Sequence, residues 1–260
     1  MEDALLEKVM QEVSKKLKQN GKAANPVEAA GCNLTEFIGT AVGDTIGLVI
    51  ANVDHLLHEK MKLDKKYRSI GVIGARIGAG PQIMAADEAV KATNSEVISI
   101  ELPRDTKGGA GHGSLIIFGS EDVSDAKRAV EVTLQTIDKT MGDVYSNEAG
   151  HLEFQYTARA SYAIGKAFGA PVGKSFGLIC AGPAAIGVIL ADTAVKAANV
   201  GIVGYASPGN GGTSYSNEVI LTVTGDSGAV RQSVTAAREA GLKLLGSLGA
   251  APVSASVPYI

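Results

Sequence analysis

The sequence lacks several residue types that mark common protein classes. Among 260 residues there is no tryptophan, aromatic residues make up 5%, and the only cysteines are Cys32 and Cys180. Neither cysteine has a second one near it in the chain, so the sequence predicts neither a disulfide framework nor a zinc site. Such sparing use of cysteine is typical of a reduced, intracellular protein. We therefore expect no metal and no cofactor.

Long hydrophobic runs and basic clusters are also absent. No apolar stretch approaches the roughly 18 residues of a membrane span, and the acidic N-terminus lacks the basic start of a signal peptide. A net charge of −3 without a basic patch argues against nucleic acid as a partner. The sequence thus predicts a soluble, cytoplasmic protein that binds neither a membrane nor nucleic acid.

An internal repeat organises the chain. The segment 86–94 (ADEAVKATN) returns as 191–199 (ADTAVKAAN), with seven of nine residues identical. The similarity extends backwards, because 69–75 (SIGVIGA) corresponds to 175–181 (SFGLICA). A repeat of about 100 residues is too long for a solenoid unit, which runs to about 20–50 residues, so each copy should be a domain with its own core.

Each repeat is predicted to alternate strands and helices. In the first we expect strands at 45–51, 69–75, 96–101 and 114–118, and helices at 53–61, 82–94 and 123–140. In the second we expect strands at 151–158, from 175, at 201–206 and at 218–224, and helices at 161–168, 185–199 and 227–244. This order predicts an α/β (α+β) fold with a ferredoxin-like split sheet.

The predicted domain boundaries follow from the repeat. Residues 2–18 form an amphipathic pattern with an apolar stripe, and the residues after them are small and polar. We expect an N-terminal helix and linker at 1–42, a first domain at 43–145, a second at 146–250, and an irregular tail at 251–260. An isolated helix of this length is marginal in water, so helix 2–18 either packs on this chain or binds a partner.

Three local motifs suggest chemistry, each with a plainer explanation. The turn Gly74–Gly80 follows a strand and opens a helix, as in dinucleotide sites, but its glycines are not spaced as G-x-G-x-x-G. The segment Gly173–Gly177 matches G-x-S-x-G without the strand that a nucleophile elbow needs before its serine. Lys91 and Lys196 each follow an aspartate by four residues, which is typical of a surface ion pair on a helix.

Two glycine-rich loops occupy equivalent places, at 103–113 and 207–217. Glycine there allows close backbone approach or motion. On the sequence alone, a pair of solvated hairpin loops is the better explanation.

The second repeat closely resembles the bacterial microcompartment shell domain. The resemblance rests on 175–179, 191–200, Gly204-Tyr205 and 225–230, and the first repeat carries Gly71, Asp87, Lys91 and Asn94 at matching places. In both copies a strand and a short helix precede the usual start, so both resemble circularly permuted domains. Segments 44–54, 102–113 and 156–162 resemble tandem permuted shell proteins of propanediol-utilising compartments, with ethanol-utilising ones as the alternative.

The resemblance implies an assembly and not a catalyst. Members of this family form homotrimers whose six domains imitate a hexagon, and these tiles contact other shell proteins at their edges. It implies that Lys91 and Lys196 lie at the tile edge, that helix 2–18 docks lumen enzymes, and that small polyols such as glycerol or 1,2-propanediol pass through pores within each subunit.

The resemblance also implies where solutes pass. Candidate residues for the pore within a subunit come from two turns and the connection between the repeats: Asn52, Asp54, Arg76, Gly78, Ala79, Gly80, Tyr145, Asn147, Glu148, Gly182 and Ala184. Candidates around a three-fold axis come from the long loops: Asp105, Lys107, Gly109, His112, Asn210, Gly211 and Ser214.

Two other classes remain as alternatives. One is a nucleotide-binding α/β enzyme that uses the Gly74–Gly80 turn. The other is an iron–sulfur shell protein, which needs a cysteine in a loop at the three-fold axis, and neither long loop contains one.

Overall fold

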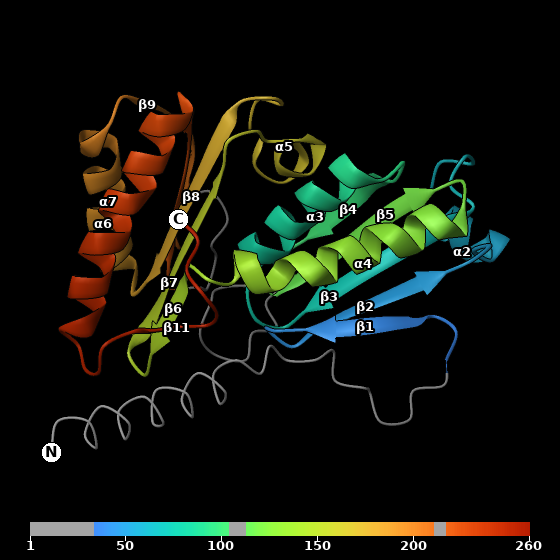
Figure 1. The fold of residues 1–260 in the computed structure, drawn as a ribbon, viewed down its shortest axis with the longest axis horizontal. Coiled ribbons are helices and arrows are strands. Elements are labelled where there is room, and N and C mark those ends of the chain that lie inside the picture. Colours follow the sequence, from blue (N-terminus) through green and yellow to red (C-terminus); the bar gives the residue numbers. More distant parts are fainter. Residues whose placement is uncertain (1–33, 104–112, 211–216) are drawn as a thin grey trace, which may run out of the picture. The chain divides into compact units, whose positions relative to one another are not determined.

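The computed structural model describes residues 34–103, 113–210 and 217–260, which belong to one compact unit (Figure 1). The predicted helix 2–18 lies outside the described residues. Among the helices described, none has the length and apolar character needed to cross a membrane.

The first domain is an antiparallel sheet with helices on one face. Its strands are β1 (Phe37–Ala41), β2 (Thr45–Ile50), β3 (Ser69–Ala75), β4 (Glu96–Glu101) and β5 (Ser114–Ser120), in the order β1-β2-β3-β5-β4. Its helices are α2 (His55–Lys60), α3 (Gly80–Ala92) and α4 (Val123–Thr140). Helix α4 packs on β1, β2, β3 and β5, beside α3.

The second domain repeats this plan. Its strands are β6 (Val144–Asn147), β7 (Gly150–Thr157), β8 (Ser175–Gly182), β9 (Val200–Ala206), β10 (Val219–Gly225) and β11 (Val253–Ser254), in the order β11-β6-β7-β8-β10-β9. Its helices are α5 (Tyr162–Phe168), α6 (Ala184–Ala197) and α7 (Ser227–Gly246). The predicted two-domain α/β architecture is confirmed, and the elements predicted by residue range have bounds within two residues of those expected.

A glycine in the central strand of each sheet brings a helix close to the strand. A side chain at Gly71 would place its Cβ 2.7 Å from Val130 of α4, and one at Gly177 would place it 2.7 Å from Val234 of α7. Because real Cβ atoms essentially never approach other atoms so closely, a side chain at either position would force the helix to shift. The two domains therefore share a packing device as well as a topology.

In Figure 1 the second sheet stands at the side of the first domain, next to α3 and α5. Helices α6 and α7 cover one face of the second sheet. Helix α3 of the first domain lies at the other face of that sheet, where it contacts β7 and α5. One hydrophobic cluster joins the domains, since Ile83 and Met84 of α3 pack with Phe176, Leu178 and Cys180 of β8.

The structure corrects three expectations at the ends of the domains. Strand β1 lies in the range 1–42 that we expected to be helix and linker, because it pairs with β2. Strand β6 lies where we expected a connection between repeats, because it pairs with β7. The tail is not irregular throughout, because β11 pairs with β6 and the residues after it return to the junction between the domains.

Candidate functional site: the junction between the two domains

Helix α3 makes the central contact of the junction. Its residues Ile83 and Met84 are 0% and 4% exposed, and they belong to the cluster that spans both domains. A hydrophobic side chain of this size contributes about 1.5–3 kcal/mol when it is fully buried. The two domains are therefore held together chiefly by apolar burial along this helix.

The equivalent helix of the second domain lacks such a partner in the described chain. The repeat places Val188 and Ile189 of α6 at the positions of Ile83 and Met84, yet these side chains are 49% and 52% exposed. Helix α6 packs on its own sheet and on α7. Its outer face is thus an apolar surface of the kind that usually marks an interaction site.

The first sheet carries the complementary open surface. In strand pairing, Ile46 lies opposite Gly74 and Leu48 opposite Val72, so these residues share the face turned away from α4. Ile46 is 40% exposed, and Leu48 and Val72 are half-buried. In the second sheet the corresponding face holds Leu178, which is 3% exposed and packs with α3.

A buried carboxylate also ties the domains. Asp87 of α3 is 0% exposed, and its carboxylate accepts hydrogen bonds from the backbone N–H groups of Ser161 (2.9 Å) and Ile164 (3.2 Å) at the start of α5. The Ser161 hydroxyl donates to the same carboxylate. Lys91 Nζ lies 2.8 Å from Asp87 Oδ2, which confirms the predicted pair. Asp87 therefore acts as an N-cap supplied by the other domain.

The two short helices are capped differently. No hydrogen bond from the Ser161 side chain caps α5, whereas α2 is capped by its own Asp54, whose carboxylate accepts from Leu56 N (2.9 Å) and Leu57 N (3.3 Å). Only α5 depends on an aspartate from another domain for this contact. The sequence showed the Asp87–Lys91 spacing but not this role, since the role arises only when the domains dock.

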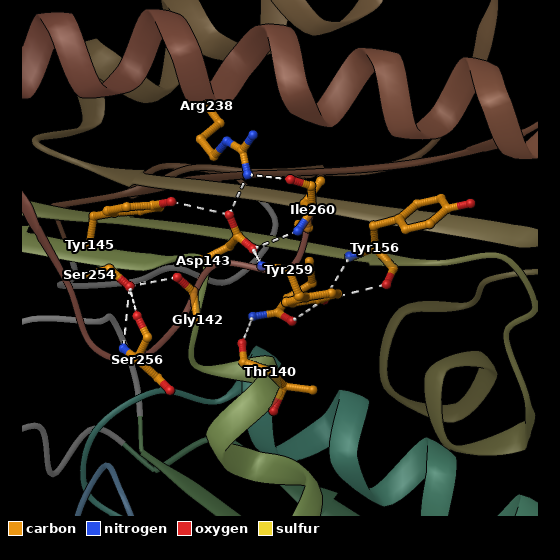
Figure 2. A network of polar contacts seen from close by, with 11 residues as sticks. Thr140, Gly142, Asp143, Tyr145, Tyr156, Arg238, Ser254, Ser256, Tyr259 and Ile260 are labelled. Atoms are coloured by element: carbon orange, nitrogen blue, oxygen red, sulfur yellow. Dashed lines mark hydrogen bonds and ion pairs between the residues drawn. The ribbon is translucent and has the colours of Figure 1, made fainter. Parts of the chain in front are cut away.

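A second buried carboxylate, Asp143, anchors the C-terminal tail (Figure 2). Arg238 of α7 lies 2.6 Å from its Oδ1, and the backbone N–H groups of Tyr259 (2.8 Å) and Ile260 (3.0 Å) donate to its Oδ2. Tyr145 also donates its hydroxyl to this carboxylate (3.2 Å). Burial and the nearby Asp143 charge raise the pKa of Tyr145 to about 12.

The tail then crosses to the end of the first domain. The Tyr259 hydroxyl donates to Gln155 Oε1 (3.0 Å), and Gln155 Nε2 donates to the carbonyl of Thr140 at the end of α4 (2.8 Å). Figure 2 shows these residues as one continuous network that joins α4, β7, α7 and the tail. The network fixes the position of the second domain on the first.

A polar groove of about 660 Å³ lies beside this network. It is bordered by α3 and α4 of the first domain and by β7, α7 and the tail of the second. Its polar lining side chains are Glu88, Gln135, Thr136, Lys139, Thr140, Tyr156, Thr157, Arg231 and Tyr259. Sequence reasoning proposed none of them for the pore, because they come from five separate segments.

The structure brings several predicted pore residues to one end of the second sheet. A Cβ at Gly80 would lie 1.8 Å from Glu153 Oε1 of β7, and one at Gly182 would lie 2.8 Å from the ring of His151. Ala184 N donates to Asn217 Oδ1 (3.2 Å). Asn147 closes the β6–β7 turn by accepting from Ala149 N and Gly150 N. The two predicted turns therefore lie along the same strand.

Other predicted pore residues are placed differently. Arg76 and Glu148 are exposed, Ala79 is half-buried and Gly78 is buried with φ +79°. Asn52 and Asp54 lie beyond Ile50, at the opposite end of the β2–β3 pair from Ala75 and the turn that follows it, so they are not neighbours of that turn. Tyr145 is 7% exposed in the second core, so its side chain does not line the junction as expected.

The predicted three-fold loops fall mostly outside the described residues. Asp105, Lys107, Gly109, His112, Gly211 and Ser214 are among those not described. Asn210 is exposed and forms a tight turn with Ser207, whose carbonyl accepts from Asn210 N at 3.0 Å. At the predicted tile edge, Lys196 pairs with Asp192 (2.7 Å) and is 73% exposed, whereas Lys91 is 28% exposed.

A compact cluster of His151, Cys180 and Glu218 adjoins the turn at Gly182. The candidate metal-ligand atoms of these three described side chains all lie within 4.8 Å of one another. The neighbouring Glu153 is buried, and burial together with the Glu218 charge raises its pKa to about 8. Burial and Glu218 likewise raise the pKa of the Cys180 thiol.

The nucleotide alternative finds no support in this geometry. The start of α3, where a phosphate would bind, is buried against β7, and Gly80 N–H donates to the protein's own Glu153 carboxylate. The G-x-S-x-G alternative fails as well, because Ser175 is buried at the start of β8 and its hydroxyl donates to Ala158 O (3.2 Å). The contact surface on α3 is occupied within the chain, whereas the equivalent surface on α6 is exposed. This pattern is typical of a structural protein that assembles with copies of itself.

Comparison with known proteins agrees with that class. The family described as "BMC domain" matches residues 69–149 and 175–256, more than half of the chain. The two matches begin at β3 and β8. In each domain two strands and a short helix precede that starting strand, which is the order expected of a circularly permuted domain.

Individual relatives cover most of the chain. The bacterial microcompartment shell protein PduB of Citrobacter freundii is 67% identical over 229 residues, which are 88% of this chain and 84% of the relative. A crystal structure of EtuB from Clostridium kluyveri is 62% identical (87% of this chain, 99% of that one, TM-score 0.84). A crystal structure of a trimeric shell protein PduB is 54% identical (87% and 100%, TM-score 0.83). The chain therefore belongs to the BMC-domain family of bacterial microcompartment shell proteins.

Proposed function

We propose that this chain forms a homotrimeric tile of a propanediol-type microcompartment shell. The observation that carries the proposal is the unequal use of two equivalent surfaces. Helix α3 is buried on the second sheet of its own chain, whereas α6 leaves Val188 and Ile189 about half exposed and the first sheet leaves Ile46 open. Helix α6 of one chain fits the open sheet of the next.

When one surface of each chain contacts a different surface of the next chain, the chains form a closed ring if a whole number of them completes a full turn. Each chain supplies two similar domains, so three chains supply six. A relative that is 54% identical over 87% of this chain is described as trimeric, which supports this number. The propanediol type is favoured because a PduB protein is 67% identical, while the 62% identity to EtuB keeps the ethanol type as the alternative.

The trimer is tested on α6. Val188→Glu places a charge on the apolar face while leaving the buried side of the helix unchanged, so we expect a folded monomer by light scattering and circular dichroism. Val123→Lys is the matched control, since Val123 is 43% exposed at the start of α4 and outside both proposed surfaces. A trimer that survives Val188→Glu, or that dissociates equally in the control, contradicts the proposed contact.

We further propose that small polyols such as glycerol or 1,2-propanediol enter the tile between the two domains of one chain. The groove beside α4 offers hydroxyl, amide and charged groups that exchange hydrogen bonds with a polyol as it loses water. Weak and multiple contacts of this kind allow a solute to leave as well as enter. At the other end of the junction, Arg76, Ala79, Glu148 and Ala184 remain candidates for contacts with the solute.

The groove proposal is tested by blocking it. Gln135→Trp fills the groove from α4, and Asp138→Trp puts the same side chain on the same helix outside the lining. We expect glycerol soaked into crystals of the control to occupy the groove and to be absent from the Gln135 variant. Glycerol found only on the three-fold axis contradicts the proposal. Gly80 is unsuitable for this test, because a side chain there collides with Glu153.

Two partner contacts complete the proposal. Lys91 and Lys196 bind neighbouring shell proteins across the tile edge, as compact charges on flexible stems suit such contacts. Replacing both with alanine should preserve trimers and abolish two-dimensional sheets in electron microscopy, and unchanged sheets contradict this role.

Residues 2–18 bind an enzyme inside the shell, because the apolar stripe that their sequence predicts gains most from a groove on another protein. Deleting residues 1–31 should preserve the trimer and lose the enclosed cargo, whereas unfolding of the truncated chain shows a structural role instead.

A further inference from the structure

The cluster of His151, Cys180 and Glu218 has the geometry of a metal site. His151 Nε2 lies 3.1 Å from Glu218 Oε2, and Cys180 Sγ lies 3.9 Å from His151 Nε2 and 3.7 Å from Glu218 Oε2. The three atoms thus form a small triangle with one nitrogen, one sulfur and one oxygen. The side chains of His151 and Glu218 are 13% and 1% exposed, and Cys180 is 4% exposed.

Strand pairing explains why these three side chains meet. His151 lies opposite Gly182 on neighbouring strands, and Cys180 lies two residues before Gly182 on the same face of β8. Glu218 directly precedes β10, which pairs with β8 on its other side. Since Gly182 has no side chain, the His151 ring leans across β8, where a Cβ at Gly182 would be only 2.8 Å from ring carbon Cε1.

The fold itself does not demand these residues. By the two strand pairings, the first-domain counterpart of Cys180 is Gly74, and that of Glu218 is Gly113. The first domain builds the same sheet without a thiol or a carboxylate at either place. The second domain instead buries a thiol and a carboxylate side by side, with the His151 ring next to both.

We propose that His151 Nε2, Cys180 Sγ and Glu218 Oε2 bind a zinc ion. Zinc favours four ligands at tetrahedral angles, with bonds of about 2.3 Å to sulfur and about 2.0–2.2 Å to nitrogen and oxygen. These bonds require distances of about 3.3–3.6 Å between ligand atoms, close to the 3.1, 3.7 and 3.9 Å observed. Binding replaces the Cys180 thiol proton, which passes to solvent.

The fourth position falls to a water molecule or to Glu153, which lies opposite Cys180 in the β7–β8 pairing. The ion joins three neighbouring strands next to the turn that starts α6, the helix proposed to contact the next chain. This proposal departs from the expectation, drawn from the spacing of the cysteines, that the chain holds no zinc site. The spacing rule looks for clustered cysteines, whereas this site takes one ligand from each of three distant segments.

Cobalt(II) tests the site, because it takes the same ligands and reports them by absorption. Full-length protein freed of metal with EDTA is titrated with Co²⁺ alone. We expect one ion per chain, a cobalt–thiolate charge-transfer band in the near ultraviolet, and intense visible bands of a four-coordinate ion. Zinc should displace the cobalt and, at about a hundredfold excess over its Kd, raise the Tm by about 5 °C or more.

The variants distinguish the site from other cobalt binding. Cys180→Ser should remove the thiolate band, and Glu218→Gln should weaken cobalt affinity at least tenfold. Cys32→Ser, which changes the other cysteine of the chain, should leave both unchanged. Circular dichroism without metal shows whether each variant folds. A wild-type protein without a thiolate band, or a band that follows Cys32, overturns the proposal and leaves the cluster as a buried hydrogen-bond network.

Discussion

Replacing Asp87 with alanine tests the inter-domain cap. The change removes a carboxylate that is 0% exposed and accepts from Ser161 N, Ser161 Oγ and Ile164 N. A buried hydrogen bond to a charged group contributes about 1.5–3 kcal/mol, and loss of an N-cap costs about 0.5–2 kcal/mol. Because these contributions overlap, we expect the free energy of unfolding to fall by about 3 kcal/mol.

The second repeat supplies the matched control. Asp192 occupies the same helical position, but its carboxylate pairs with Lys196 on the exposed surface, so Asp192→Ala should cost at most about 0.5 kcal/mol. In the proposed trimer, Asp192 of one chain would lie near α2 of the next, as Asp87 lies near α5. Since α2 is already capped by Asp54, Asp192→Ala should still cost less than Asp87→Ala. Urea unfolding of both variants at one protein concentration measures the difference. Equal losses, or a larger loss in Asp192→Ala, refute the assigned role of Asp87.

Three further changes test other parts of the structure. Asp143→Asn leaves Arg238 without its buried partner and should cost about 3–5 kcal/mol in urea unfolding; a loss under 1 kcal/mol contradicts the proposed anchor. Between pH 4.5 and about 8 the Glu153 carboxyl stays protonated in the folded chain but is ionised in the unfolded chain. The free energy of unfolding should therefore fall as the pH rises through that range in metal-free buffer. Glu153→Gln should remove that slope, and an unchanged pH profile shows that Glu153 is ionised when folded. Gly177→Ala should cost about 1–3 kcal/mol through contact with α7, while Gly209→Ala, which meets nothing within 4 Å, should be neutral; equal effects contradict the close-packing argument.

The elements that follow strong local patterns were predictable from the sequence. Helix α4 and strand β3 have the predicted bounds, because apolar spacing and glycine turns mark both. Strand β1 was not predicted, since its short sequence, FIGTA, becomes a strand only by pairing with β2. The tail was unpredictable for a similar reason: its order depends on the distant Asp143 and Gln155.

The candidate site was predictable only in part. The repeat located the two turns, and the structure places both along β7. Asn52 was misplaced because sequence distance does not show which end of a strand pair a residue occupies. Tyr145 was misplaced because its side chain packs into the second core, which the sequence around it does not show. The groove residues and the His151–Cys180–Glu218 cluster left no local signal, because each set is assembled from segments that meet only after docking or strand pairing.

The mass of the native particle tests the central claim most directly. One chain has a mass of 26.6 kDa, so a closed ring of three has about 80 kDa. We expect sedimentation equilibrium at micromolar concentration to give the trimer mass for the wild type and the single-chain mass for Val188→Glu. A wild-type protein that sediments at 26.6 kDa leaves the exposed faces of α6 and the first sheet without their proposed partner and contradicts the account.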